Sequence, residues 1–230
     1  GLRGLRISLM RPKTLVTQFR ALLAASALGP VRVMVPMVTS LEEFIAARRE
    51  WKRAQAELAA KDVPFDAHTP FGLMIETPAA VALAEELAAE ADFLSIGSND
   101  LIQYTMVVDR TNPRLGSLFN HWHPALWRQI ATVIDAARKH DVPVAVCGEM
   151  ASDPLTVPAL IGLGLQAIST HPNSIPKIKS LIRSVSYDQC QGLARQILSL
   201  KTAAAIQSAL KEFNRRIVIQ DARPPHVKTR

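Results

Sequence analysis

The chain has 230 residues, 48% of them hydrophobic, which is enough for one sizeable core and too few for two comfortable ones. It has no apolar run near the roughly 18 residues that a membrane-spanning helix needs, and its basic start lacks the apolar stretch of a signal peptide. The two cysteines, Cys147 and Cys190, show neither metal-ligand spacing nor a disulfide framework, so a reducing cytoplasm fits best.

The net charge of +7 does not by itself distinguish between classes of function. Nucleic-acid-binding proteins cluster Lys and Arg with aromatic residues between them, and aromatic residues make up only 5% of this chain. Much of the positive charge is scattered over helical positions and the C-terminal end, as is typical of a solvated surface. We therefore expect neither a nucleic-acid nor a membrane partner, and individual arginines are more informative than the total charge.

Short apolar segments alternate with longer helical patterns along the chain. The expected strands are Val31–Met37, Phe71–Glu76, Asp92–Gly97, Pro143–Cys147 and Ala167–Thr170. The expected helices are Pro12–Leu28, Ser40–Lys61, Pro78–Ala91, Pro124–His140, Pro154–Leu163, Ser174–Arg183, Tyr187–Leu200 and Thr202–Arg216. The helix starts carry typical signals: Ser40 with Glu43 as a capping box, and Pro78 and Pro154 as first-turn prolines.

The repeated strand–helix order predicts an α/β fold with a parallel sheet, either open and doubly wound or closed into a barrel. No glycine-rich phosphate loop follows a strand, which counts against a nucleotide-binding open sheet. Polar residues at the strand ends favour the barrel, because a barrel keeps its active site there. A barrel needs eight strands and the sequence shows five, so three are hidden or the chain is a piece of a longer one.

Two carboxylates follow neighbouring strands. Glu76 ends an apolar strand, and Asp100 follows the turn after the next strand. Each one alone could be a residue at the start of a helix. Together, at the same end of adjacent parallel strands, they suit Mg²⁺ that is shared with an anionic substrate.

A thiol and two arginines are further candidates. Cys147 ends a strand before a glycine; a buried structural role is the usual one for cysteine, but a thiol at this position can also act as a nucleophile or a proton donor. No Cys–His pairing is evident, so covalent thiol catalysis is not indicated. Arg110 can reach the site only if the helix after Asp100 ends and the chain turns back, and Arg3 is one of several basic residues at the start.

The segment DFLSIGSNDLIQ, Asp92–Gln103, resembles the signature of the phosphoenolpyruvate-utilising enzymes. Three further segments agree in the same order: GLRGLRISLMRP at the start, GLMIETPAA around Glu76 and CGEMASDP around Cys147. Within that superfamily, the Thr after Glu76 and the segment QYTMVVDR look like the phosphoenolpyruvate–protein phosphotransferases, the enzyme I family of the bacterial sugar phosphotransferase system.

The resemblance implies a (β/α)8 barrel of the TIM type that binds phosphoenolpyruvate with Mg²⁺. The phosphoryl group would pass to a protein histidine and pyruvate would be released. The implied roles are Mg²⁺ binding by Glu76 and Asp100, substrate binding by Arg3, Asn99, Asp100 and Arg110, and protonation of the enolate carbon by Cys147. Arg32 matches no substrate-binding residue and is interpreted as structural.

The family barrel begins with three strands that this sequence lacks, so the resemblance implies an incomplete barrel from a longer protein, inactive by itself. Residues 1–216 are expected to form the barrel domain and residues 217–230 a disordered tail. The implied partners are phosphoenolpyruvate and pyruvate, an upstream phosphohistidine domain, the histidine-containing phosphocarrier protein and a second copy in a homodimer. No phosphohistidine-like motif occurs, so the histidines are expected in loops or on the surface: His68, His121, His123, His140, His171 and His226.

Two alternatives stay open. The chain could belong to a pyruvate phosphate dikinase or phosphoenolpyruvate synthase, where a nucleotide-binding domain would lie upstream. It could also be a non-catalytic barrel remnant that serves dimerisation or regulation.

Overall fold

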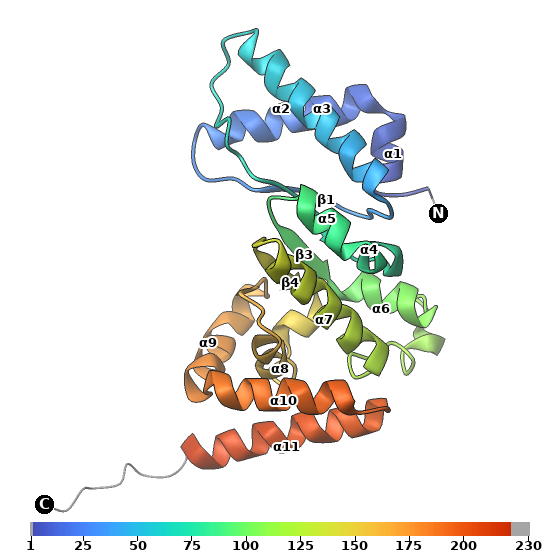
Figure 1. The fold of residues 1–230 in the computed structure, drawn as a ribbon, viewed down its shortest axis with the longest axis vertical. Helices are drawn as coiled ribbons and strands as arrows, with labels where there is room; N and C mark the ends of the chain where they lie inside the picture. Colours follow the sequence, from blue (N-terminus) through green and yellow to red (C-terminus); the bar gives the residue numbers. More distant parts are fainter. Residues whose placement is uncertain (1, 222–230) are drawn as a thin grey trace, which may run out of the picture.

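The computed structural model describes residues 2–221, and Figure 1 shows their arrangement. The helices are α1 Leu5–Met10, α2 Pro12–Ser26, α3 Leu41–Ala59, α4 Pro78–Ala82, α5 Ala84–Glu90, α6 Ser98–Met106, α7 Pro124–Lys139, α8 Val157–Gly162, α9 Ile175–Ser184, α10 Tyr187–Ser199 and α11 Ala203–Asp221. The strands are β1 Val33–Val35, β2 Phe71–Ile75, β3 Leu94–Gly97, β4 Val144–Cys147 and β5 Ala167–Ile168. Short 3₁₀ helices are η1 Pro113–Leu115, η2 Glu149–Ser152 and η3 Pro172–Ser174.

The strands form one parallel sheet in the order β1-β2-β3-β4-β5. Each strand therefore pairs with its neighbour in sequence, with helices in the connections, as in successive βα units of a barrel. The sheet stays open, with β1 and β5 at its edges among the described residues. The expected α/β fold and incomplete barrel are confirmed.

One face of the sheet is a continuous apolar layer. The register aligns Val35 with Leu73, Leu73 with Leu94, and Leu94 with Val144, so their side chains lie side by side on that face. All four are at most 5% exposed. Side chains alternate between faces along a strand, so the residues between them point to the opposite face, where Met34 is 41% exposed.

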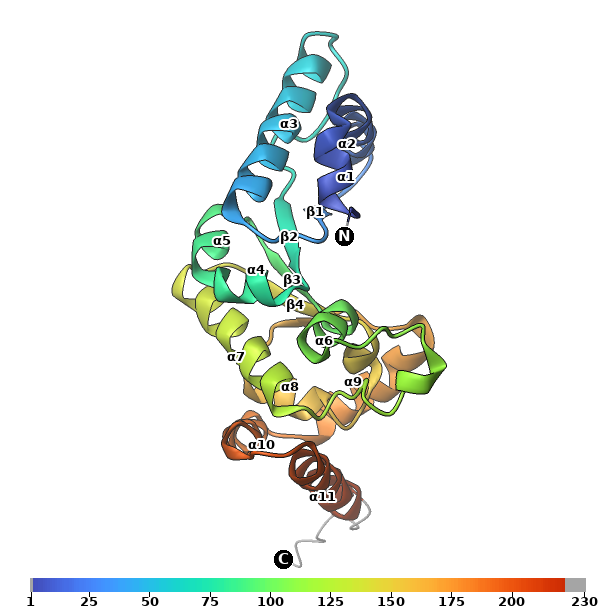
Figure 2. The same cartoon turned by 90° about the vertical axis from the view of Figure 1, so that its right-hand side faces the viewer.

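An aromatic cluster joins the start of β2 to the first helices. The Phe71 ring lies 5.1 Å from Trp51, 5.6 Å from Phe19 and 5.7 Å from Phe44, measured between ring centroids. Edge-to-face and offset pairs at such distances stabilise a core beyond their burial. The cluster attaches α2 and α3 to the sheet at the end opposite to α10 and α11 (Figure 2).

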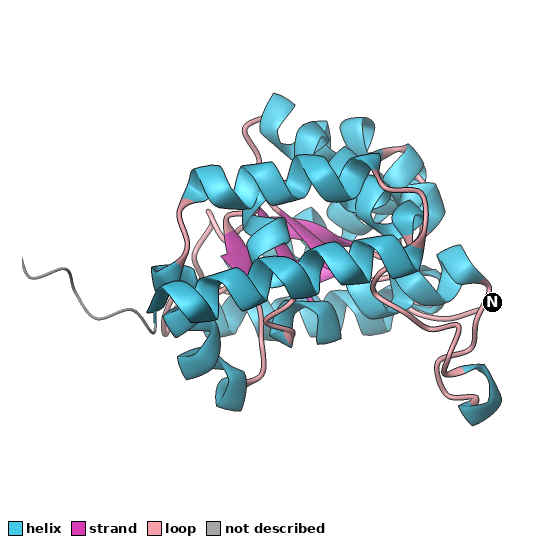
Figure 3. Cartoon of the chain, turned by 90° about the horizontal axis from the view of Figure 1, so that it is seen from below, coloured by secondary structure: helices cyan, strands magenta, loops and turns pink. Residues whose placement is uncertain are grey.

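The helices pack both on their neighbours in sequence and on helices further along the chain. α2 packs on α3, α5 on α7, and α10 on both α7 and α8, while α11 packs on α10. Figure 3 shows the strands at the centre with helices around them. None of the helices described over residues 2–221 is long and apolar enough to cross a membrane.

All five expected strands are present, and most expected helices differ by one to three residues at their ends. Three helix expectations need correction. The helix expected over Pro78–Ala91 is divided at Leu83 into α4 and α5, α1 was not predicted, and the helix considered after Asp100 is present as α6, which begins at Ser98. α8 has Pro158 rather than Pro154 in its first turn.

The capping box of α3 forms only by half. The Ser40 hydroxyl accepts the Glu43 N–H at 3.3 Å, but the Glu43 carboxylate accepts from Thr39 instead, at 2.8 Å from both its N–H and its hydroxyl. α11 runs five residues past its expected end at Arg216, and residues 222–230 of the expected tail lie outside the described residues.

Substitutions at two glycines, compared with each other, test how closely α8 packs against α10. A methyl group at Gly162 would overlap the Cys190 backbone in α10, whereas one at Gly192, within α10, would meet nothing within 4 Å beyond its chain neighbours and the backbone of its own helix. We expect Gly162→Ala to lower the free energy of unfolding by about 2 kcal/mol or more. Gly192→Ala should raise it by about 1 kcal/mol, because alanine favours a helix. Denaturant unfolding measures both, and equal effects would contradict this packing.

Candidate functional site

The candidate site begins with a row of residues across the carboxyl edge of the sheet. β3 and β4 align Gly97 with Cys147, and β2 and β3 align Ile75 with Ile96, which places Glu76 beside Gly97. A Cβ atom at Gly97 would lie 2.9 Å from Glu76 Oε2. The Glu76 side chain therefore lies over Gly97, which has no side chain, on the same face and at the same edge of the sheet as the Cys147 thiol.

Glu76 is buried and held by the backbone of the preceding loop. Its side chain is 3% exposed, and Oε1 accepts the Met37 N–H at 2.8 Å. Met37 adopts the left-handed conformation, with φ of 58°, which is uncommon outside glycine. Burial raises the pKa of Glu76 above its ordinary value, and the nearby charge of Asp100 raises it further, against lowering by the Met37 N–H, Arg3 and Arg110.

Asp100 lies in the first turn of α6 and faces the start of the chain. Its Oδ1 is 3.7 Å from the Arg3 guanidinium and 3.5 Å from the Gln103 amide. Arg3 also donates a hydrogen bond of 3.0 Å to the Tyr104 hydroxyl on α6. These contacts join the first residues of the chain to the end of β3, and Figure 2 shows α6 beside that part of the sheet.

The chain does turn back after α6, as a role for Arg110 requires. α6 ends at Met106 and is capped by Val107, which has φ of 55° and ψ of 44° and donates its N–H to the Gln103 carbonyl. A β-branched residue in the left-handed region is a genuine outlier. The Gln103 side-chain oxygen then accepts the Arg110 N–H at 3.2 Å. Arg3, Asp100 and Arg110 consequently line one cleft of about 640 Å³.

Asn99 and Cys147 line a neighbouring cleft of about 750 Å³. Asn99 Oδ1 accepts the Glu149 N–H at 3.0 Å. The Cys147 thiol lies 3.5 Å from the Ile96 carbonyl, to which it donates, and 3.7 Å from the Ser95 hydroxyl. Gly148, which joins Cys147 to Glu149, has φ of 93°, and a Cβ atom there would lie 2.9 Å from Asn99 Oδ1.

The environment of Cys147 keeps its thiol protonated. Burial is the main cause that raises its pKa above the ordinary value, and the charges of Glu76 and Asp100 add to the rise. The Ser95 hydroxyl acts in the opposite direction with less effect than burial. A neutral thiol suits proton donation better than nucleophilic attack, for which the thiolate is the reactive form.

The donor set at Glu76 and Asp100 fits a hard divalent cation. Glu76 uses Oε1 for the Met37 N–H, which leaves Oε2 above Gly97, and a cation would relieve the mutual repulsion of the two carboxylates. Within residues 2–221 no group of three or more His, Cys, Asp or Glu side chains is placed to bind a metal. Such an ion would therefore need further oxygens from water or substrate.

The structure thus places the candidate residues in two groups at the carboxyl edge of the sheet. One group is Arg3, Glu76, Asp100 and Arg110, and the other is Asn99 and Cys147. Arg32 lies elsewhere, at the amino end of β1, with its guanidinium 5.8 Å from the centre of the Phe93 ring. Sequence reasoning missed the supporting groups Met37, Ser95, Gln103 and Tyr104. Only Gln103 and Tyr104 carried a signal, because they follow Asp100 at the three- and four-residue spacing of one helix face.

The raised pKa of Glu76 has a consequence for stability. A carboxyl group whose pKa is higher in the folded chain favours folding at low pH, and this contribution is lost as the pH rises through the folded-state pKa. Without metal ions, Glu76→Gln should therefore unfold at a higher denaturant concentration than the unchanged chain at about pH 8, and at the same concentration at about pH 4. Gln can still accept the Met37 N–H. A destabilised Glu76→Gln at high pH would contradict the burial of an unpaired charge.

Comparisons of the sequence with known proteins find a family model and curated relatives. Residues 1–187 match the family model described as "PEP-utilising enzyme, PEP-binding domain". The chain is 44% identical to a multiphosphoryl transfer protein of Xanthomonas campestris pv. campestris, over 90% of this chain and 24% of that protein. It is 40% identical to a phosphoenolpyruvate-protein phosphotransferase of Buchnera aphidicola and 41% identical to that of Haemophilus influenzae, in each case over 93% of this chain and 37% of the relative.

A solved citrate lyase structure from Burkholderia xenovorans shares the fold. It has a TM-score of 0.54 and 16% sequence identity, and the match covers 92% of this chain and 71% of that one. The chain spans at most 37% of the length of the three curated relatives above. The chain belongs to the phosphoenolpyruvate-binding domain family of the phosphoenolpyruvate-utilising enzymes.

Proposed function

We propose that this chain is the substrate-binding part of a phosphoenolpyruvate–protein phosphotransferase. It binds phosphoenolpyruvate with Mg²⁺, and the phosphoryl group passes to a protein histidine as pyruvate is released. The observation that supports this most is the row at the carboxyl edge of the sheet, where the Glu76 carboxylate and the Cys147 thiol share one face. Charged groups of both signs surround it, as a trianionic substrate with a cation requires.

The arginines and the amide bind the substrate. Arg3 and Arg110 line the cleft beside Asp100, and a guanidinium group offers paired N–H donors to phosphate or carboxylate oxygens. Asn99 contributes its amide from the neighbouring cleft. Phosphoryl transfer needs positioning and charge neutralisation more than covalent assistance from the protein, and these side chains supply both.

Glu76 and Asp100 hold the Mg²⁺. When bound, the ion supplies charge neutralisation for the phosphate and for the enolate oxygen as the phosphoryl group leaves. Glu76 is buried and fixed by the Met37 N–H, so its carboxylate is already oriented before the substrate arrives. Arg3, which lies 3.7 Å from Asp100, keeps that second carboxylate beside the substrate cleft.

Cys147 donates a proton to the methylene carbon of the enolate. The new C–H bond forms as the S–H bond breaks, which gives pyruvate and a thiolate that later regains a proton from water. The raised pKa of the thiol supports this role, because the proton stays on sulfur until a strong carbon base is present.

The partners proposed for the whole protein are those that the family resemblance implies. We infer an upstream phosphohistidine domain as the first phosphoryl acceptor, followed by the histidine-containing phosphocarrier protein, and a homodimeric state. The cytoplasm is the proposed location, and the free thiols of Cys147 and Cys190 fit its reducing conditions. A non-catalytic barrel remnant, the alternative, would bind no phosphoenolpyruvate.

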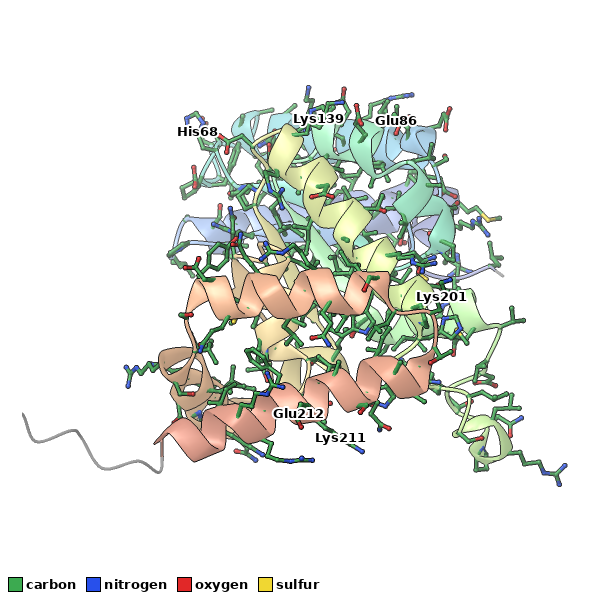
Figure 4. The ribbon with its side chains drawn as sticks, turned by 60° about the horizontal axis from the view of Figure 1, so that its bottom comes forward. His68, Glu86, Lys139, Lys201, Lys211 and Glu212 are labelled. Carbon is green, nitrogen blue, oxygen red and sulfur yellow. The ribbon has the colours of Figure 1, made fainter. Side chains whose placement is uncertain are left out.

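Calorimetric titration with phosphoenolpyruvate tests the metal ligands. The unchanged chain should bind more tightly with Mg²⁺ than without it, and Glu76→Gln and Asp100→Asn should each weaken the Mg²⁺-dependent binding by about tenfold or more, equivalent to about 1.4 kcal/mol. Glu86→Gln is a matched control, because Glu86 is exposed on the surface of α5 (Figure 4). Binding that is independent of Mg²⁺, or unchanged in both site variants, would refute the assignment.

Replacement of Cys147 by Ala should separate binding from chemistry. In the complete phosphotransferase that carries this domain, the variant should bind phosphoenolpyruvate normally and form pyruvate about 100-fold more slowly or worse, since a positioned acid contributes that much. Cys190→Ala, in the buried face of α10, is the matched control and should leave the rate unchanged. A normal rate of pyruvate formation in Cys147→Ala would exclude the thiol as the proton donor.

A further inference from the structure

His121 lies in the loop between η1 and α7, as expected, but its side chain is only 16% exposed. The Phe119 and Trp122 rings meet it edge to face, with centroids 6.1 and 6.0 Å away. Its Nε2 atom is buried and has no hydrogen-bond partner in the described part of the chain. A buried polar atom without a partner costs free energy, so this imidazole needs an explanation.

The imidazole shares the cleft of Asn99 and Cys147. Glu149 lines the same cleft, and its carboxylate Oε2 lies 3.9 Å from His121 Nε2. That carboxylate is 68% exposed and makes no other ion pair among residues 2–221, so it is free to approach the imidazole. A small rotation of Glu149 would therefore satisfy His121.

The backbone of Glu149 is tied to the candidate site. Its N–H donates to Asn99 Oδ1 at 3.0 Å, which fixes the orientation of the Asn99 amide. With Oδ1 occupied in this way, the NH₂ end of Asn99 is left to donate to an anionic ligand. The position of Glu149 thus determines where Asn99 presents its donor.

We propose that His121 is a positioning residue of the candidate site, which acts through Glu149 on the Asn99 amide. The effect of His121 on substrate binding rests on the proposed function, in which Asn99 binds the substrate. His121 itself need not touch the substrate. Its contact with Glu149 holds the loop after β4 against the start of α6.

The charge of His121 should make this contact depend on pH. Burial lowers the pKa of His121 below its ordinary value, and the facing carboxylates Glu149 and Asp153 act against this. His171 is the other histidine among the residues that line the cleft, whose lining includes no Lys or Arg. The imidazolium forms only as the pH falls through the lowered pKa, so the ion pair with Glu149 is present at low pH and lost as the pH rises.

The first test needs no ligand. The side-chain amide NMR signal of Asn99 is followed in the 230-residue chain between about pH 5 and pH 8. We expect a titration step that disappears in His121→Gln and in Glu149→Gln. It should persist in His68→Gln, because His68 lies in a different cleft, beside the start of β2. An Asn99 signal with the same pH dependence in His121→Gln as in the unchanged chain overturns the proposal.

The second test separates this proposal from the proposed function. Titration with phosphoenolpyruvate and Mg²⁺ should show about fivefold weaker binding for His121→Leu, the effect of one hydrogen bond, and near-normal binding for His121→Gln, which keeps a polar group. If Glu76→Gln loses binding while His121→Leu binds like the unchanged chain at every pH, only this proposal is overturned. If Glu76→Gln also binds normally, the proposed function fails, and the NMR titration still decides the role of His121.

Discussion

The site depends on the register between three neighbouring parallel strands. Because β2, β3 and β4 are paired without a shift, Glu76, Gly97 and Cys147 form one row at one edge and on one face. The central member of that row has no side chain, and this gives the Glu76 carboxylate the space above β3. A shift of one residue in the pairing of β2 with β3 or of β3 with β4 would point the side chain of Glu76 or Cys147 to the other face, into the apolar layer.

The loops after the strands position the other side chains of the site. The left-handed Met37 directs its N–H at Glu76, and the left-handed Val107 ends α6 so that Arg110 returns towards Asp100. Gly148 lets the loop after β4 lie against Asn99. Backbone conformations that are costly for ordinary residues persist where the surrounding structure holds them, and they cluster at functional sites. The sheet and these loops together place acidic, basic and thiol groups around one small volume.

The strands and most helices could be predicted because their signals are local: apolar runs bounded by turns, helix caps and periodic spacing. The carboxylates and the thiol were found in the same way, from their place after strands. What stayed hidden depends on three-dimensional contacts, such as the burial of His121, the Ser95 hydroxyl beside Cys147 and the reach of Arg110. The break at Leu83 within an apparently continuous helix and the short α1 also lack a clear local pattern.

The most direct test of the account is to find where a divalent cation binds on this chain. Mn²⁺ takes the oxygen ligands of Mg²⁺ and broadens the NMR signals of nearby nuclei. With phosphoenolpyruvate present, the account predicts that a small amount of Mn²⁺ broadens the backbone amide signals of Met37, Gly97 and Asp100 before all others. Broadening that is uniform, or that begins near His68 in its separate cleft, would contradict a metal site at the row of Glu76 and Gly97.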